Sequence, residues 1–206
     1  MSPRWSDPSK VSWIFDGRMD MWVQDRESQF ASAFTDIYGH VFENAINWLA
    51  DQNITNGCNP PINTRYCLDD SVTRGEMAVF ISRALDLPAP SGDHFTDDQG
   101  KFYENAANRL FEAGITVGCG SGQYCGDQRI SREQMAAFLA RTLGLTGTST
   151  DYFVDGDGSL FKGAINKIAA AGITQGCDPL SNDRYCPTGY VTRGQMAAFL
   201  RRALGP

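Results

Sequence analysis

The feature that most constrains the fold is a motif that recurs three times along the chain. Each copy opens with Phe-x-Asp, at Phe34, Phe95 and Phe153, so the copies begin 61 and 58 residues apart (34 to 95 and 95 to 153). A helical segment, a loop with two cysteines and a second helical segment follow in each copy. An internal period of this length is typical of a chain built from similar structural units. We expect three repeats, at residues 34–90, 91–148 and 149–206, after an N-terminal arm at residues 1–33.

The second helical segment of each copy begins with a capping box. A Thr or Ser provides the N-cap, and a Glu or Gln three residues later completes the pattern in which side chain and backbone cap each other. Apolar residues then follow at helical spacing, as at Met77, Phe80 and Ile81. The predicted N-cap residues are Thr73, Ser131 and Thr192.

An arginine occupies the first helical position after each cap, at Arg74, Arg132 and Arg193. A cation there is disfavoured by roughly 0.3–1 kcal/mol, because the N-terminus of a helix is electropositive. Unpaired backbone N–H groups at the same place, together with a guanidinium, form a good binding site for a carboxylate or phosphate. The alternative is that each arginine bends away to a surface carboxylate. Because an arginine occupies this unfavourable position in all three copies, we favour the anion site.

Six cysteines fall as one pair in each repeat, which favours three local disulfide bonds. Closing loops this short should contribute about 2–3 kcal/mol each on the chain-entropy model. Zinc is the alternative, but the spacing is not Cys-x-x-Cys and the only histidines are His40 and His94, so no metal or other cofactor is predicted. Disulfide bonds indicate an oxidising compartment. The predicted pairs are Cys58 with Cys67, Cys119 with Cys125, and Cys177 with Cys186.

Residues 1–33 lie outside the repeat and are rich in aromatic side chains. Asp16-Gly17 between two short runs predicts a β-hairpin. A lone hairpin is marginally stable in water, so it needs to pack on the rest of the chain or on a partner, and the sequence leaves both open. No signal peptide is visible at the N-terminus, which does not fit an oxidising compartment. The candidate docking residues are Trp5, Trp13, Phe15 and Trp22.

Composition excludes several classes of function. A hydrophobic fraction of 42% predicts a folded core, while a net charge of −6 and a pI near 4.9 argue against a nucleic-acid partner. No apolar stretch approaches the roughly 18 residues of a membrane span. The sequence has no G-x-S-x-G and no HExxH motif, and its cysteines are used in pairs, so we predict that the chain is not an enzyme.

Together, the repeated motifs are similar to those of a known family. Phe-x-Asp, a helix, Gly-Ile-Thr-x-Gly, an aromatic residue before the second helix and Thr-Arg-Gly-Glu/Gln resemble the S-layer homology repeat, over about five-sixths of the chain. The resemblance implies a mainly α fold in which three copies form a pseudo-threefold body around a central helical bundle. It also implies non-catalytic binding of an acidic, pyruvylated cell-wall polysaccharide in grooves between the copies, at a bacterial cell surface. The arginines that would contact the acidic sugar are Arg74, Arg132 and Arg193.

The sequence also departs from the family pattern. Val41, Phe102 and Leu160 stand where the family usually has Trp, and Gly-Cys and Tyr-Cys replace family residues around the loop, which looks like a cysteine-bridged variant. The aspartate of Phe-x-Asp has two interpretations. It could accept sugar hydroxyls or orient an arginine, or it could accept backbone N–H groups near a helix start, which is the commoner role. These residues are Asp36, Asp97 and Asp155.

Two other functions stay open at this point. The chain could be a structural subunit of a large extracellular assembly, such as a phage virion or a surface filament, docked through residues 1–33. It could also be a disulfide-bonded spacer whose arginines pair with nearby carboxylates.

Overall fold

A computed structural model describes residues 32–178 and 180–205. The chain divides into two units, Met1–Ser32 and Ala33–Pro206, and the second is described here. The hairpin arm predicted within residues 1–33, with its four aromatic residues, falls almost entirely outside the described residues. Over the described residues the prediction of a mainly α fold is confirmed, because isolated β-bridges are the only strand-like pairing there. The helices are α2 (Glu43–Asp51), α3 (Arg74–Ala84), α4 (Glu104–Glu112), α5 (Arg132–Thr142), α6 (Lys162–Ala170) and α7 (Arg193–Leu204).

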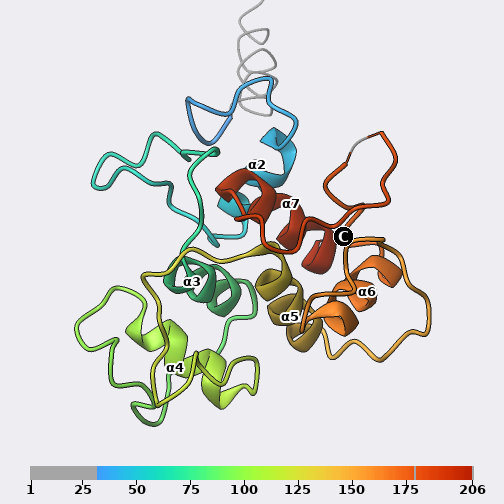
Figure 1. Ribbon diagram of the computed structural model, residues 1–206. Coiled ribbons are helices and arrows are strands. Elements are labelled where there is room, and N and C mark those ends of the chain that lie inside the picture. The colour runs from blue at the N-terminus through green and yellow to red at the C-terminus, as the bar shows by residue number, and fades with distance from the viewer. Residues whose placement is uncertain (1–31, 179, 206) are drawn as a thin grey trace, which may run out of the picture. The chain divides into compact units, whose positions relative to one another are not determined.

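The helices pack in pairs that join one copy of the motif to the next. Helix α3 of the first copy packs on α4 of the second, and α5 of the second packs on α6 of the third. Helix α7 of the third copy then packs back on α2 of the first, so the series closes on itself. In Figure 1, α3, α5 and α7 lie toward the middle of this unit, with α2, α4 and α6 outside them. Each copy therefore supplies part of the apolar environment of its neighbour.

Three backbone hydrogen bonds form a closed ring where the copies meet. The N–H of Val72 donates to the carbonyl of Val191 (2.9 Å), that of Val191 to Ile130 (3.1 Å), and that of Ile130 to Val72 (2.9 Å). The three residues precede the capped helices α3, α7 and α5, and all three are fully buried. A cyclic arrangement of equivalent atoms of this kind is what a pseudo-threefold body produces.

The N-caps have the geometry that the capping-box pattern predicts. The side chain of Thr73 accepts the N–H of Glu76 (3.1 Å), and the carboxylate of Glu76 accepts the N–H of Thr73 (2.9 Å). Ser131 with Gln134 and Thr192 with Gln195 form the same reciprocal pair. These caps fix where the second helices begin and therefore where their arginines lie.

The Gly of Thr-Arg-Gly is required by the helix that packs on it. A Cβ built on Gly75 would lie 2.2 Å from the ring of Tyr103, and one on Gly194 would lie 2.4 Å from the ring of Phe42. In the second copy Glu133 takes this position, and its carboxylate instead accepts the hydroxyl of Ser159 (2.6 Å). Packing between copies therefore explains why glycine follows the arginine in the first and third copies.

Within the described residues, none of the helices is long and apolar enough to span a membrane.

Candidate functional site

The three predicted arginines are buried between copies of the motif. The exposed fractions of Arg74, Arg132 and Arg193 are 6%, 5% and 5%. Each Nε donates to a tyrosine carbonyl in the disulfide loop of the next copy around the ring, and the hydroxyl of that tyrosine donates back to the arginine's own carbonyl. The Nε–O distances are 3.0 Å for Arg74–Tyr124, 2.7 Å for Arg132–Tyr185 and 2.8 Å for Arg193–Tyr66, and the returning bonds are 2.9, 2.7 and 3.0 Å.

Aromatic rings lie close to each guanidinium. The carbon Cζ of Arg132 lies 4.8 Å from the ring centroid of Tyr185 and 5.5 Å from that of Phe199. Arg74 and Arg193 have equivalent Tyr and Phe neighbours at 4.8–5.3 Å. Burial lowers the pKa of Arg74 and Arg132, yet an arginine starts so high that both stay charged. Carbonyl dipoles and ring faces therefore offset part of the cost of burying these cations.

The N–H groups at the starts of the second helices are already used. The N–H of Arg74 donates to Gln128 and that of Gly75 to Gly126, both in the next copy, and the third N–H is capped by Thr73. Helices α5 and α7 use the same scheme, with carbonyls at Gly189, Pro187, Asp70 and Leu68. The expectation that these N–H groups form an open anion site with the guanidinium is therefore wrong, because the neighbouring copy fills it. The same contacts explain how an arginine is tolerated at the electropositive end, since its side chain turns away to carbonyl oxygens.

The aspartates of Phe-x-Asp hold the loop that contacts the arginine. Asp36 accepts the N–H groups of Tyr66 and Cys67 at 2.8 Å each, and Asp97 and Asp155 accept the equivalent pairs at 2.7–2.9 Å. Burial raises the pKa of Asp36, but the two N–H donors and Arg65 outweigh it, and the net pKa lies below the usual value. In this structure the aspartates bind backbone N–H groups, the second of the two interpretations above.

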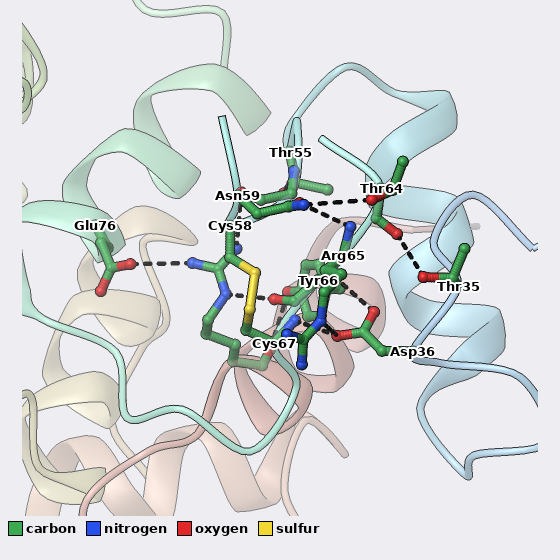
Figure 2. The surroundings of a disulfide bond; sticks show 12 residues. Thr35, Asp36, Thr55, Cys58, Asn59, Thr64, Arg65, Tyr66, Cys67 and Glu76 are labelled. Carbon is green, nitrogen blue, oxygen red and sulfur yellow. Dashed lines mark hydrogen bonds and ion pairs between the residues drawn. A yellow bond between two sulfur atoms is a disulfide. The ribbon is translucent and has the colours of Figure 1, made fainter. Parts of the chain in front are cut away.

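Each loop is closed by the predicted disulfide, Cys58–Cys67, Cys119–Cys125 or Cys177–Cys186. Figure 2 shows the first, with Asp36, Tyr66 and Glu76 around it. The tyrosine before the second cysteine (Tyr66, Tyr124 or Tyr185) was not predicted as a site residue. Its fixed place beside the second cysteine of every copy is the signal that could have identified it.

Two clefts open beside the buried arginines. A cleft of about 870 Å³ is bordered by Arg193, the loop Ile54–Cys58 and helix α3, with Phe102 also on its wall. A smaller cleft of about 370 Å³ is bordered by Arg132, the loop Thr174–Asp178 and helix α7. We name them the Arg193 cleft and the Arg132 cleft.

The two clefts differ in the charge next to the arginine. In the Arg193 cleft, Nη1 donates to the carboxylate of Glu76 (3.0 Å) and Nη2 to the carbonyl of Gly57 (3.3 Å). In the Arg132 cleft Gln195 stands at the position of Glu76, and Nη2 donates to the carbonyl of Gly176 (3.1 Å). For Arg74, where Gln134 takes this position, neither terminal nitrogen has a hydrogen-bond partner among the described residues.

Residues 94–136 match the family model of the S-layer homology domain. The chain contains an S-layer homology domain. The match covers α4, the Cys119–Cys125 loop and the capped start of α5, which is the second copy of the motif. Domains of this family bind cell-wall polysaccharides, which indicates attachment at the cell wall or cell surface.

Curated relatives carry this similarity as a small part of much longer chains. An amylopullulanase of Thermoanaerobacterium thermosulfurigenes is 30% identical over 185 residues, 84% of this chain and 9% of the relative. An endoglucanase of Bacillus sp. (strain KSM-635) is 36% identical over 78 residues, 38% of this chain and 8% of the relative. A cell surface protein of Thermoanaerobacter kivui is 31% identical over 112 residues, 50% of this chain and 14% of the relative. The chain thus spans less than a fifth of each of these relatives.

Proposed function

We propose that this chain is a non-catalytic attachment module that binds an acidic cell-wall glycan in the clefts beside its buried arginines. The observation that carries the proposal is the placement of a positively charged side chain at the edge of each cleft, inside a chain that contains an S-layer homology domain. Acidic groups such as a ketal-linked pyruvate or a uronate carboxylate fit that charge. The three repeats, at residues 34–90, 91–148 and 149–206, would act together as one body.

The architecture supports this reading, because every cleft lies between a disulfide loop and a second helix that the ring holds rigidly. A site held by buried contacts loses little conformational entropy on binding, which favours affinity for a flexible polymer. Several modest sites on one body also gain from avidity where one polymer can reach more than one of them.

The test is co-sedimentation of the full chain with bacterial cell-wall sacculi. One batch keeps its secondary polysaccharide and a matched batch has been stripped of it by hydrofluoric acid. We expect the chain to pellet with the first and to stay in solution with the second, and its binding to weaken as salt rises, because the attraction between charges is screened. Equal binding to both batches would overturn the proposal.

A further inference from the structure

A second arginine recurs nine positions after each buried one, at Arg83, Arg141 and Arg202, and all three are exposed. Each lies in or near the last turn of a second helix. Each donates through Nη1 to the carbonyl of the isoleucine that precedes Thr-x-Gly in its own copy. The acceptors are Ile54 (3.3 Å), Ile115 (3.3 Å) and Ile173 (3.4 Å). One weak hydrogen bond thus orients the guanidinium toward the loop, and its other N–H groups have no hydrogen-bond partner in the part of the chain that the structure describes.

Two of these exposed arginines lie on the same clefts as buried ones. Arg83 borders the Arg193 cleft and Arg202 borders the Arg132 cleft. The third, Arg141, borders a different cleft, between α5 and α6 with Lys167 on its wall, and its charge adds to burial in lowering the pKa of Arg74. Two like charges on one side of a cleft repel each other, and an anion between them would relieve that repulsion.

In two of the buried arginines, Arg193 and Arg132, most side-chain nitrogens already donate to groups of the protein. All three side-chain nitrogens of Arg193 are engaged, by Tyr66, Glu76 and Gly57. Two of the three in Arg132 are engaged as well. The carboxylate of Asp178, which also borders the Arg132 cleft, accepts the hydroxyl of Ser181 (2.8 Å) and the N–H of Leu180 (2.9 Å). Both terminal nitrogens of Arg74 lack a partner among the described residues, but all three buried arginines are only 5–6% exposed. Cationic donors open to solvent therefore come from the second arginines, and in the Arg193 cleft from Arg129 as well.

We propose that Arg83, Arg141 and Arg202 make the direct contact with the acidic group of the wall glycan, and that Arg74, Arg132 and Arg193 are positioning residues that lock the loops around it. The ligand chemistry is a carboxylate or phosphate carried on a polysaccharide, because a guanidinium with free N–H groups can bind two oxygens of either group. This inference rests on the function proposed above and assigns the contact within it.

The experiment compares variants of the full chain for binding to a purified secondary cell-wall polysaccharide. In R83Q/R141Q/R202Q we expect affinity to fall at least 10-fold and the dependence on salt to flatten, while R83K/R141K/R202K keeps most of the salt dependence. R184Q is the control, because Arg184 is exposed on the third disulfide loop, carries the same charge and borders neither cleft. It should bind within 2-fold of the unmodified chain.

Two treatments of the polysaccharide distinguish the sources of the anion. Reduction of its carboxyl groups should abolish binding if the contact is to a carboxylate, and removal of phosphate should do so if it is to a phosphate. Loss of affinity in either arm supports the inference. Normal binding by R83Q/R141Q/R202Q overturns it while leaving the proposed function intact. A loss of affinity in R184Q as large as that in the triple variant would also overturn it. Failure of the unmodified chain to bind the untreated polysaccharide would overturn the function itself.

Discussion

The Arg193 cleft and the Arg132 cleft share one framework but differ in whether an acid contacts the buried arginine. In both, the arginine Nε binds a tyrosine carbonyl of the neighbouring copy, and a Thr-x-Gly loop supplies a second carbonyl. Glu76 then neutralises Arg193, whereas Gln195 leaves Arg132 without a carboxylate partner among the described residues. The repeat therefore conserves the clamp between copies and varies the electrostatics of the cleft.

The largest expected effect comes from removing the buried arginine, which both clefts have. Arg132→Ala removes the donors to Tyr185 and Gly176 and leaves a void beside Phe199. The free energy of unfolding should fall by about 3–5 kcal/mol, because buried carbonyls lose their partners and packing is lost. Arg193→Ala should lose a similar amount. Urea unfolding measures both, with Arg184→Ala as the control. A loss below about 0.5 kcal/mol in either variant would contradict a structural clamp.

An intermediate effect comes from a further difference between copies, at the residue after Phe-x-Asp. Asp98 and Ile37 take equivalent positions and both are fully buried. Oxygen Oδ1 of Asp98 has no hydrogen-bond partner among the described residues, and burial, followed by the charge of Asp93, raises the pKa of Asp98 to about 6. A raised pKa means that the folded chain binds this proton more tightly than the unfolded chain, whose Asp titrates near 3.9.

The stability due to Asp98 is therefore full below about pH 4 and is lost as pH rises through about 6. Asp98→Asn should be more stable than the unmodified chain by about 1–3 kcal/mol at pH 7.5, with the advantage vanishing near pH 4. Urea unfolding of the two proteins at pH 4, 6 and 7.5 measures the difference, in which other titrating groups cancel. An advantage that does not change with pH would show that Asp98 is already ionised at little cost.

The smallest effect sharpens the contrast between the clefts directly. Glu76→Gln should strengthen binding of an acidic glycan roughly 3- to 10-fold, and Gln195→Glu should weaken it by a similar factor, because one charge near the ligand is worth about 1 kcal/mol. Both changes keep an oxygen for the capping box, so the helix starts are preserved. Calorimetric titration at low salt measures both. Two changes in the same direction would show that this acid does not govern affinity.

Local structure in this chain was predictable, and the family resemblance implied a pseudo-threefold body, but the residues that meet between copies were not predicted. The capping boxes and disulfides follow from short-range patterns such as Thr73 with Glu76 or Cys58 with Cys67, and these are as predicted. The N–H groups of Arg74 and Gly75 were expected to be open, because one copy taken alone does leave them so. Their partners, Gln128 and Gly126, lie about fifty residues away in another copy. The sequence period shows that the copies exist. It does not show which carbonyl groups of one copy accept the free N–H groups of another.

The closing contact of α7 on α2 has a consequence for how such a chain can change in length. Deleting or duplicating one unit would leave an apolar helix face without its cover and break the cycle through Val72, Ile130 and Val191. Growth by single units is therefore penalised, unlike in an open solenoid, where units stack end to end. A longer attachment region would have to be assembled from whole triplets.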